Sequence, residues 1–96
     1  MQDKLVIVAH VAVQPEFAEM LAPEFEAVVE ATRKEEGNIS YDLYVDVNDP
    51  NRLTFVEVWQ SQQAIDSHNA SDHFRTFAKA DRRKASLEVS VLKQKL

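Results

Sequence analysis

Apolar and polar positions in the first third of the chain predict one strand followed by one long helix. The apolar, β-branched run Leu5–Val13 is typical of a strand, and both of its faces are apolar apart from His10. Residues 15–36 are predicted to form a helix with one apolar face, which Pro23 should kink or restart. Gly37 follows this segment, and we expect it to end the helix in the left-handed conformation.

The rest of the chain continues with shorter predicted elements. In order they are a strand, a second strand that pairs with it as a hairpin, two helices and a last strand, over residues 38–47, 53–60, 62–68, 72–84 and 86–92. Ser61 and Ser71 directly precede the two helices, and each is suited to cap its helix.

This element order predicts the fold class. Strand, helix, strand, strand, helices, strand is the α+β, ferredoxin-like split βαβ arrangement, a four-stranded antiparallel sheet with helices on one face. The first and third strands are apolar on both faces, so the helices leave an apolar sheet face uncovered. A bare apolar patch of that size marks an interface, and a second copy packed by two-fold symmetry is the simplest cover. We therefore expect a homodimer through the sheet, a dimeric α+β barrel.

Composition narrows the function mainly by exclusion. The 96 residues predict a single domain, 1–96, and 16 acidic against 11 basic side chains disfavour nucleic acid as a partner. No apolar run approaches the roughly 20 residues of a membrane span. The absence of cysteine excludes thiolate chemistry, and a single glycine excludes a phosphate-cradling loop. We expect a cytoplasmic domain that binds neither nucleic acid nor membrane.

One face of the third strand combines apolar side chains with a carboxylate and an indole. Phe55, Glu57 and Trp59 alternate along this face. Burial without a partner raises a carboxyl pKa, so Glu57 is a proton-transfer candidate. The alternative is that Glu57 pairs with an arginine and that Trp59 is core. Tyr41 shares its strand face with apolar neighbours and is a candidate for lining a pocket.

Two histidines lie at the junction of the two short helices. His68 and His73 are five residues apart, which does not place both on one helix face, and no third ligand is evident. We therefore predict no metal site. Either histidine can act as a general acid or base, and the alternative is that each binds the junction backbone. His10 is expected to be an interface histidine.

A basic stripe follows on the last predicted helix. Its members are Arg75, Lys79, Arg82 and Arg83. Such a stripe is usually solvated surface, and its functional alternative is the binding of an anionic substrate.

Three sequence blocks resemble the antibiotic biosynthesis monooxygenase family, whose members are small dimeric ferredoxin-like proteins. The blocks are EEGNISY at residues 35–41, EVWQS at 57–61 and AIDSHNASDHF at 64–74. Order and spacing fit from Leu5 to Leu92, nearly the whole chain. The resemblance therefore implies the same fold and dimer that the strand pattern predicts.

The resemblance also implies candidate reactions. Members include quinol monooxygenases that oxygenate electron-rich phenols without flavin, haem or metal. The fold also resembles an isomerase of a phosphorylated autoinducer, which is similar in the EEGN joint and the paired histidines but has Tyr at the position of Trp59. Haem-degrading relatives rely on an Asn in the first strand, which Leu5–Val13 lacks, and this argues against haem.

The resemblance favours a cofactor-independent monooxygenase of quinol-like or polycyclic phenols. Phe55, Tyr41 and Trp59 would line a dry pocket for a small aromatic or carbonyl substrate. His68 or His73 would remove the phenolic proton. The developing oxyanion would be stabilised by one of two candidates, Asn38 or a protonated Glu57.

Two alternatives remain open at this point. The first is an isomerase of a small phosphorylated diketone, for which Arg75 or Lys79 would meet the phosphate at the pocket mouth. The second is a non-catalytic dimeric binding or stress-response module. It is favoured if Glu57, His68 and His73 are all occupied by structural contacts.

Overall fold

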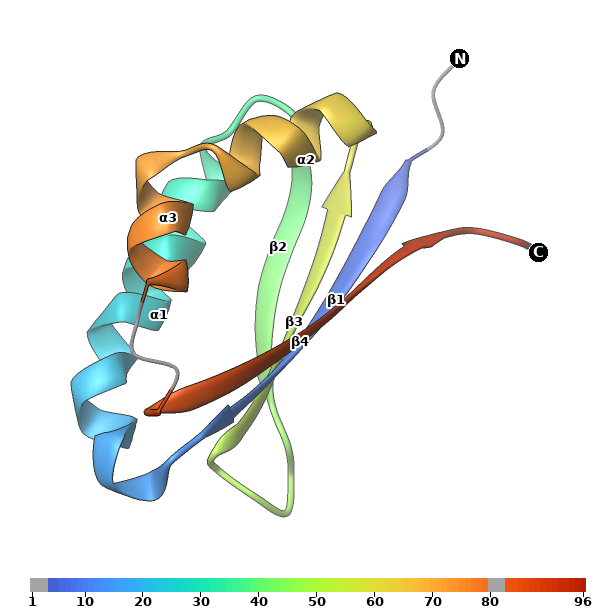
Figure 1. The fold of residues 1–96 in the computed structure, drawn as a ribbon. Coiled ribbons are helices and arrows are strands. Elements are labelled where there is room, and N and C mark those ends of the chain that lie inside the picture. The colour runs from blue at the N-terminus through green and yellow to red at the C-terminus, as the bar shows by residue number, and fades with distance from the viewer. Residues whose placement is uncertain (1–3, 80–82) are drawn as a thin grey trace.

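Four strands and three α-helices follow one another in the predicted order in the computed structural model, which describes residues 4–79 and 83–96 (Figure 1). A short 3-10 helix precedes the first α-helix. The elements are β1 (Leu5–Val13), the 3-10 helix (Pro15–Phe17), α1 (Ala18–Arg33), β2 (Asn38–Val45), β3 (Arg52–Trp59), α2 (Gln62–Asn69), α3 (Asp72–Ala78) and β4 (Ala85–Lys93).

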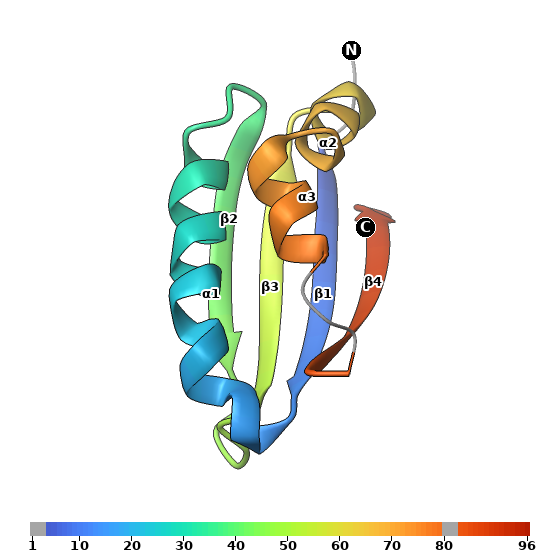
Figure 2. The ribbon, with the colours of Figure 1, turned by 60° about the vertical axis from the view of Figure 1, so that its left-hand side comes forward.

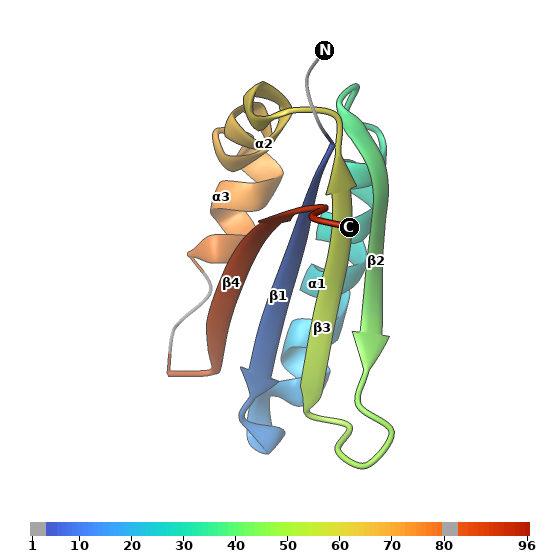
Figure 3. The same ribbon diagram turned by 90° about the vertical axis from the view of Figure 1, so that its right-hand side faces the viewer.

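The strands form one antiparallel sheet in the order β2-β3-β1-β4. All three helices lie on the same side of it (Figure 1), and the view from the other side shows the sheet in front of α1 (Figure 3). This is the ferredoxin-like α+β arrangement, and the predicted fold class is confirmed. Among the described residues, no helix has the length and apolar character that crossing a membrane requires.

The core lies between the sheet and the helices. Alternate residues of β1 and β3 face it, with Ile7 opposite Glu57 and Ala9 opposite Phe55. α1 lies over the β2 side of the sheet, and α2 and α3 lie over its middle, whereas β4 extends beyond them (Figure 2). The core-side row of β4, Leu87, Val89 and Val91, is consequently half exposed.

The first helix differs from its prediction at both ends. It begins after a 3-10 turn and ends at Arg33, three residues before the predicted end. Pro23 lies inside α1 without interrupting it. Because Pro23 is exposed, the carbonyl that loses its amide partner can be solvated. The earlier end releases Glu35 from the helix, and this places its side chain beside α2 and α3.

Gly37 has a different role from the one predicted. Its φ angle is not positive, so the left-handed helix end is wrong. A Cβ atom at this position would instead overlap the Cβ of Ala64 in α2. The Gly37 carbonyl also accepts a hydrogen bond from the Gln60 amide, at 3.0 Å. Glycine is therefore required because α2 approaches the start of β2 closely.

The second strand is shorter than predicted and starts with a bulge. Asn38 pairs with Trp59 and Ser40 with Val58, which leaves Ile39 as the extra residue. Ile39 is 45% exposed, so it does not share the buried environment of Tyr41 as the alternation predicted. The strand ends at Val45, two residues before the predicted end.

The last helix is also shorter than predicted. Ser61 and Ser71 cap α2 and α3 as expected, accepting hydrogen bonds from the amides of Ala64 and Phe74. However, α3 ends at Ala78 and not near residue 84. The chain must turn before Ala85, because β4 begins there by pairing with Val13. The predicted basic stripe does not form on one helix, and its member Arg82 lies outside the described residues.

Candidate active site

The central feature of the candidate site is a carboxylate shared by two imidazoles. Glu35 lies just after α1, His68 in the last turn of α2 and His73 in the first turn of α3. One oxygen, Glu35 Oε2, is 2.6 Å from His68 Nδ1 and 2.8 Å from His73 Nε2. The two histidines thus meet across the helix junction.

The hydrogen bonds of this cluster assign the histidine tautomers. Ser71 Oγ donates its proton to the His68 carbonyl at 2.6 Å and accepts from the Phe74 amide at 3.2 Å. His73 Nε2, 3.2 Å from Ser71 Oγ and next to Glu35, must therefore be a donor. His68 Nδ1 likewise donates to the Glu35 carboxylate. In a neutral His68, the lone pair is consequently on Nε2.

Burial favours the neutral form of His68. Its side chain is 2% exposed, and this desolvation lowers its pKa, with the hydrogen bond to Glu35 and the Glu35 charge acting in the opposite direction. Among the described residues, no group accepts from or donates to Nε2. His68 therefore presents a free proton acceptor to its surroundings.

Glu57 is buried and bonded to an indole instead of an arginine. Trp59 Nε1 donates to Glu57 Oε1 at 2.9 Å, from two residues along the same strand face. Burial raises the pKa of Glu57 to about 7, the Trp59 hydrogen bond opposes this shift, and the charge of Glu35 adds to it. A carboxyl group with this pKa is largely protonated in slightly acidic solution and can donate a hydrogen bond.

Glu57 and His68 line the same small cavity between the sheet and the two short helices. Its volume is about 90 Å³, and its other walls are almost entirely apolar or aromatic. The lining residues are Ile7, Ala9, Tyr41, Phe55, Glu57, Ile65, His68, Asn69, Phe74, Phe77, Leu87, Val89 and Val91. Burial and the neighbouring Glu57 charge raise the pKa of Tyr41, so its hydroxyl stays protonated.

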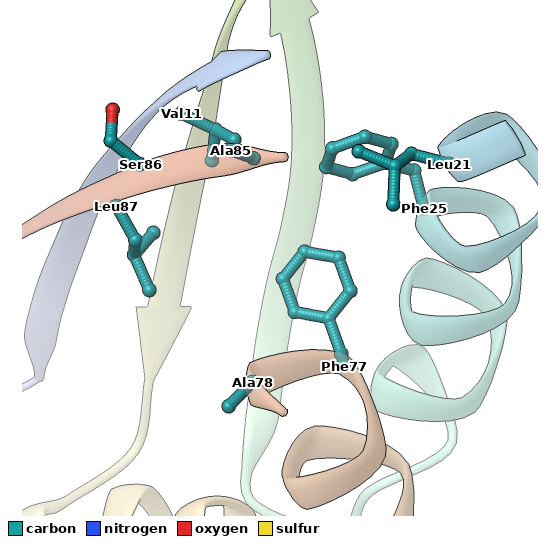
Figure 4. A pocket seen from close by; sticks show the side chains of 8 residues that line it. All are labelled: Val11, Leu21, Phe25, Phe77, Ala78, Ala85, Ser86 and Leu87. Carbon is teal, nitrogen blue, oxygen red and sulfur yellow. The ribbon is translucent and has the colours of Figure 1, made fainter. Parts of the chain in front are cut away.

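A larger cavity of about 420 Å³ adjoins the small one, and Phe77 and Leu87 line both. Leu21 and Phe25 of α1 point into it from one side and Val11 and Leu87 of the sheet from the other (Figure 4). None of its lining residues is titratable. The proton-transfer groups therefore lie in the small cavity, and the larger one extends its apolar space.

The structure brings some predicted site residues to the cavity and leaves others outside it. Tyr41, Phe55, Glu57 and His68 line it. Trp59 is 0% exposed and contacts Glu57 from the core. His73 lies behind His68 on Glu35.

Two further candidates do not reach the cavity. The side-chain amide of Asn38 donates to the backbone carbonyls of Ser40 and Val58, at 3.0 and 3.4 Å, and so stabilises the bulge. Arg75 is exposed on α3. His10 is exposed on the open sheet face, where its Nδ1 lies 3.1 Å from Thr54 Oγ1.

Sequence reasoning missed Glu35 as a site residue. Glu35 is the first residue of the EEGNISY block at residues 35–41, and this block was the sequence signal that could have identified it as a site residue. Glu35 is also the third potential ligand that the histidine spacing lacked. Its carboxylate and the two imidazoles together offer three metal-ligand atoms within 4.8 Å of one another.

Comparison with known proteins identifies the family. The sequence model described as antibiotic biosynthesis monooxygenase matches residues 4–80. The Bacillus subtilis protein named "Putative monooxygenase YcnE" is 32% identical over 92 residues, which cover 96% of this chain and 97% of that protein. The Mycobacterium tuberculosis protein named "Putative monooxygenase Rv0793" is 30% identical over 77 residues, 80% of this chain and 75% of that one.

Solved structures agree with this match. A conserved protein from Methanosarcina mazei superposes with a TM-score of 0.90 at 28% identity, covering 98% of this chain and 95% of that one. PA3566 from Pseudomonas aeruginosa gives a TM-score of 0.91 at 27% identity, over 100% and 98% of the two chains. Sequence and fold thus show that the chain belongs to the antibiotic biosynthesis monooxygenase family.

Proposed function

We propose that this protein is a monooxygenase that oxidises uncharged, quinol-type phenols with molecular oxygen, without flavin, haem or metal. The observation that carries the proposal is that His68, whose Nε2 is a free proton acceptor, and Glu57 line the same largely apolar cavity. The family and the names of its relatives support oxygenation as the reaction.

In this mechanism His68 starts the reaction by accepting a phenolic proton on Nε2. Glu35 holds the ring through Nδ1 and stabilises the imidazolium that forms. The electron-rich phenolate then reacts with oxygen directly. One oxygen atom enters the ring and the other leaves as water, because oxidation of the quinol to the quinone supplies the two electrons and two protons required.

Glu57 stabilises the oxyanion. Trp59 Nε1 donates a hydrogen bond to Glu57 Oε1. The other carboxyl oxygen of Glu57 carries the proton and donates it in a hydrogen bond to the substrate. This donor lies in an apolar cavity, where hydrogen bonds to developing charge are stronger than in water. The site is thus complementary to a substrate that has one hydroxyl group and one oxygen on which negative charge develops.

The two alternative functions are less well supported. No lysine or arginine lines the small cavity among the described residues, so a phosphate would meet the acidic Glu57 without a cation. This disfavours the phosphorylated diketone. A non-catalytic module would leave the unpartnered His68 Nε2 and the second Glu57 oxygen without an evident purpose.

Oxygen consumption tests the proposal. The protein is incubated with a panel of naphthoquinols and anthrones in an oxygen electrode, with a metal chelator present. We expect uptake above the autoxidation background, and one labelled oxygen atom in the product when ¹⁸O₂ is used. If oxygen uptake stays at the autoxidation background with the whole panel and the protein converts a phosphorylated diketone, the protein is an isomerase and not an oxygenase. Inactivity on both substrate classes would favour the non-catalytic module.

Glu57→Gln is expected to remove the alkaline limb of the pH profile. The proposed reaction needs neutral His68 and protonated Glu57, so kcat/KM should fall about tenfold per pH unit above pH 7, once the carboxyl with its pKa of about 7 ionises. A glutamine amide donates at every pH, so the variant's profile should stay flat there. An unchanged alkaline limb in the variant would assign that limb to another group.

The same substitution has a predictable effect on stability. The folded-state pKa of Glu57 lies above the ordinary value of 4.5, so its contribution is fully present below pH 4.5 and is lost as pH rises through 7. The wild-type free energy of unfolding should therefore lose roughly 3 kcal/mol over this window relative to Glu57→Gln. Urea titrations of both proteins at pH 4.5 and 8 measure the difference. If Glu57→Gln is instead strongly destabilising at pH 8, the carboxyl is a structural ion-pair member.

We also propose that two copies pair through the open sheet face. On this face the strand register sets Val6 beside Val58 and Leu92, and Val8 beside Val56. Leu92 is 47% exposed, and the four valines are partly exposed although no helix covers them. An apolar row across three adjacent strands supports a self-complementary interface.

Val56→Asp should disrupt this dimer. The substitution puts a carboxylate opposite Val8 in the middle of the face, and burying it unpaired costs several kcal/mol. Sedimentation velocity at micromolar concentration is expected to show a dimer for the wild type and a folded monomer for the variant. Met20→Asp, the same kind of change at an exposed position of α1, away from the open sheet face, serves as the control. A stable wild-type monomer would refute the interface.

A further inference from the structure

We propose that Glu35, His68 and His73 form a binding site for a zinc-type divalent ion, and that the bound ion switches off the catalytic histidine. The binding half stands on geometry alone, and the inhibitory half rests on the proposed function. Three ligand atoms, one from each side chain, lie within 4.8 Å of one another. They come from three segments that meet at the junction of α1, α2 and α3.

The donor set fits zinc. Two imidazole nitrogens and one carboxylate oxygen are a common zinc ligand combination, with metal–ligand distances of about 2.0–2.2 Å. Glu35 Oε2 is now 2.6 and 2.8 Å from the two nitrogens, as hydrogen bonds require. A central ion would need these atoms roughly 3.3 Å apart, the spacing of tetrahedral ligands at such distances.

The exposed side of the cluster can make that adjustment. The side chains of Glu35 and His73 are 17% and 27% exposed, whereas that of His68 is 2% exposed. Glu35 can therefore move away from the two nitrogens, and His73 can turn toward His68, whose ring nitrogen lies within 4.8 Å of that of His73, while His68 stays in place. The fourth ligand would be water from the solvent side or Ser71 Oγ, which is 3.2 Å from His73 Nε2.

Metal binding would reverse the His68 tautomer. In the metal-free cluster, Nδ1 carries the proton that binds Glu35, and Nε2 carries the lone pair. An ion on Nδ1 requires the lone pair there, so the proton of a neutral ring moves to Nε2. The ring then presents an N–H group to the cavity and cannot accept a phenolic proton. The ion would thus be an inhibitor of the reaction and not its cofactor.

Calorimetric titration tests the binding half. We expect one Zn²⁺ per chain, with affinity at least tenfold weaker in His73→Ala and in Glu35→Gln. His10→Ala, which removes the histidine outside the cluster, should bind within about twofold of the wild type. Mg²⁺, which prefers oxygen ligands, should not bind. Circular dichroism checks that each variant is folded. Failure of the wild type to bind Zn²⁺, or undiminished binding by both cluster variants, would overturn the proposal.

Nitrogen NMR of the histidine rings tests the switch independently of any activity. Added Zn²⁺ should move the Nε2 signal of His68 from the range of an unprotonated nitrogen to that of an N–H group. If the protein consumes oxygen with quinols, Zn²⁺ should abolish that uptake and a chelator should restore it. Binding without the Nε2 change would overturn the switch, whereas lack of oxygenase activity would overturn the proposed function alone.

Discussion

Replacement of His68 by glutamine is expected to lower kcat/KM for quinol oxidation by roughly 10²–10⁴-fold, the usual contribution of a general base. Glutamine can still donate to Glu35 from its amide but offers no basic nitrogen to the cavity. The reduction should therefore come from lost proton transfer and not from lost folding. Oxygen uptake under pseudo-first-order conditions measures it, with the thermal unfolding midpoint as the check on folding.

The matched variant is His73→Ala. His73 shares Glu35 with His68 but does not line the cavity, so we expect a loss of no more than about tenfold, through weaker positioning of His68. Equal losses for both variants would mean that the two imidazoles act as one unit. A larger loss of kcat/KM in His73→Ala than in the His68 variant would mean that His73 is the base.

Trp59→Ala is expected to lower the free energy of unfolding by about 3–5 kcal/mol, the range for a large aromatic residue in a packed core. Trp59 is 0% exposed, and its ring centroid lies 4.7 Å from that of His68. If Trp59 instead lined the pocket, as the family resemblance implies, the substitution would lower the free energy of unfolding by less. A domain of this size has about 5–15 kcal/mol of stability in total, so the variant should be marginal. Urea denaturation measures the change.

Trp59→Phe separates packing from hydrogen bonding. It keeps most of the aromatic volume but removes the Nε1 donor to Glu57. Because that bond favours the ionised carboxylate, its loss should raise the Glu57 pKa further and move the alkaline limb of activity to higher pH. A small stability cost for Trp59→Ala, with loss of ligand binding, would instead make the indole part of the pocket wall.

The fold follows from local pattern because the spacing of apolar residues within each element decides which of its faces is buried. Alternation in Leu53–Trp59 and helical spacing in 18–33 determine which faces are apolar, and the order of elements then leaves few possible topologies. The serine caps are equally local, since Ser61 and Ser71 bond to amides three residues ahead. These features were predicted correctly.

Local pattern was misleading where a distant segment decides the conformation. Gly37 has the position of a helix-ending glycine, but the close approach of Ala64 is what requires it. The sequence pattern predicted that the helix continues past Ala78, but α3 stops there because β4 must begin opposite Val13. A prediction from neighbouring residues contains no information about either contact.

For the candidate site, too, the sequence predicted some features and tertiary packing decided the others. The sequence by itself determined that Glu57 and Trp59 share a buried strand face and that two histidines flank a helix junction. Only the tertiary structure joined Glu35 to His68 and His73, which lie 33 and 38 positions further along the chain. That contact depends on how the end of α1 packs against α2 and α3, which sequence spacing does not encode. For the same reason, only the packed structure assigned the free nitrogen of His68 and placed this residue in the wall of the cavity that Glu57 lines.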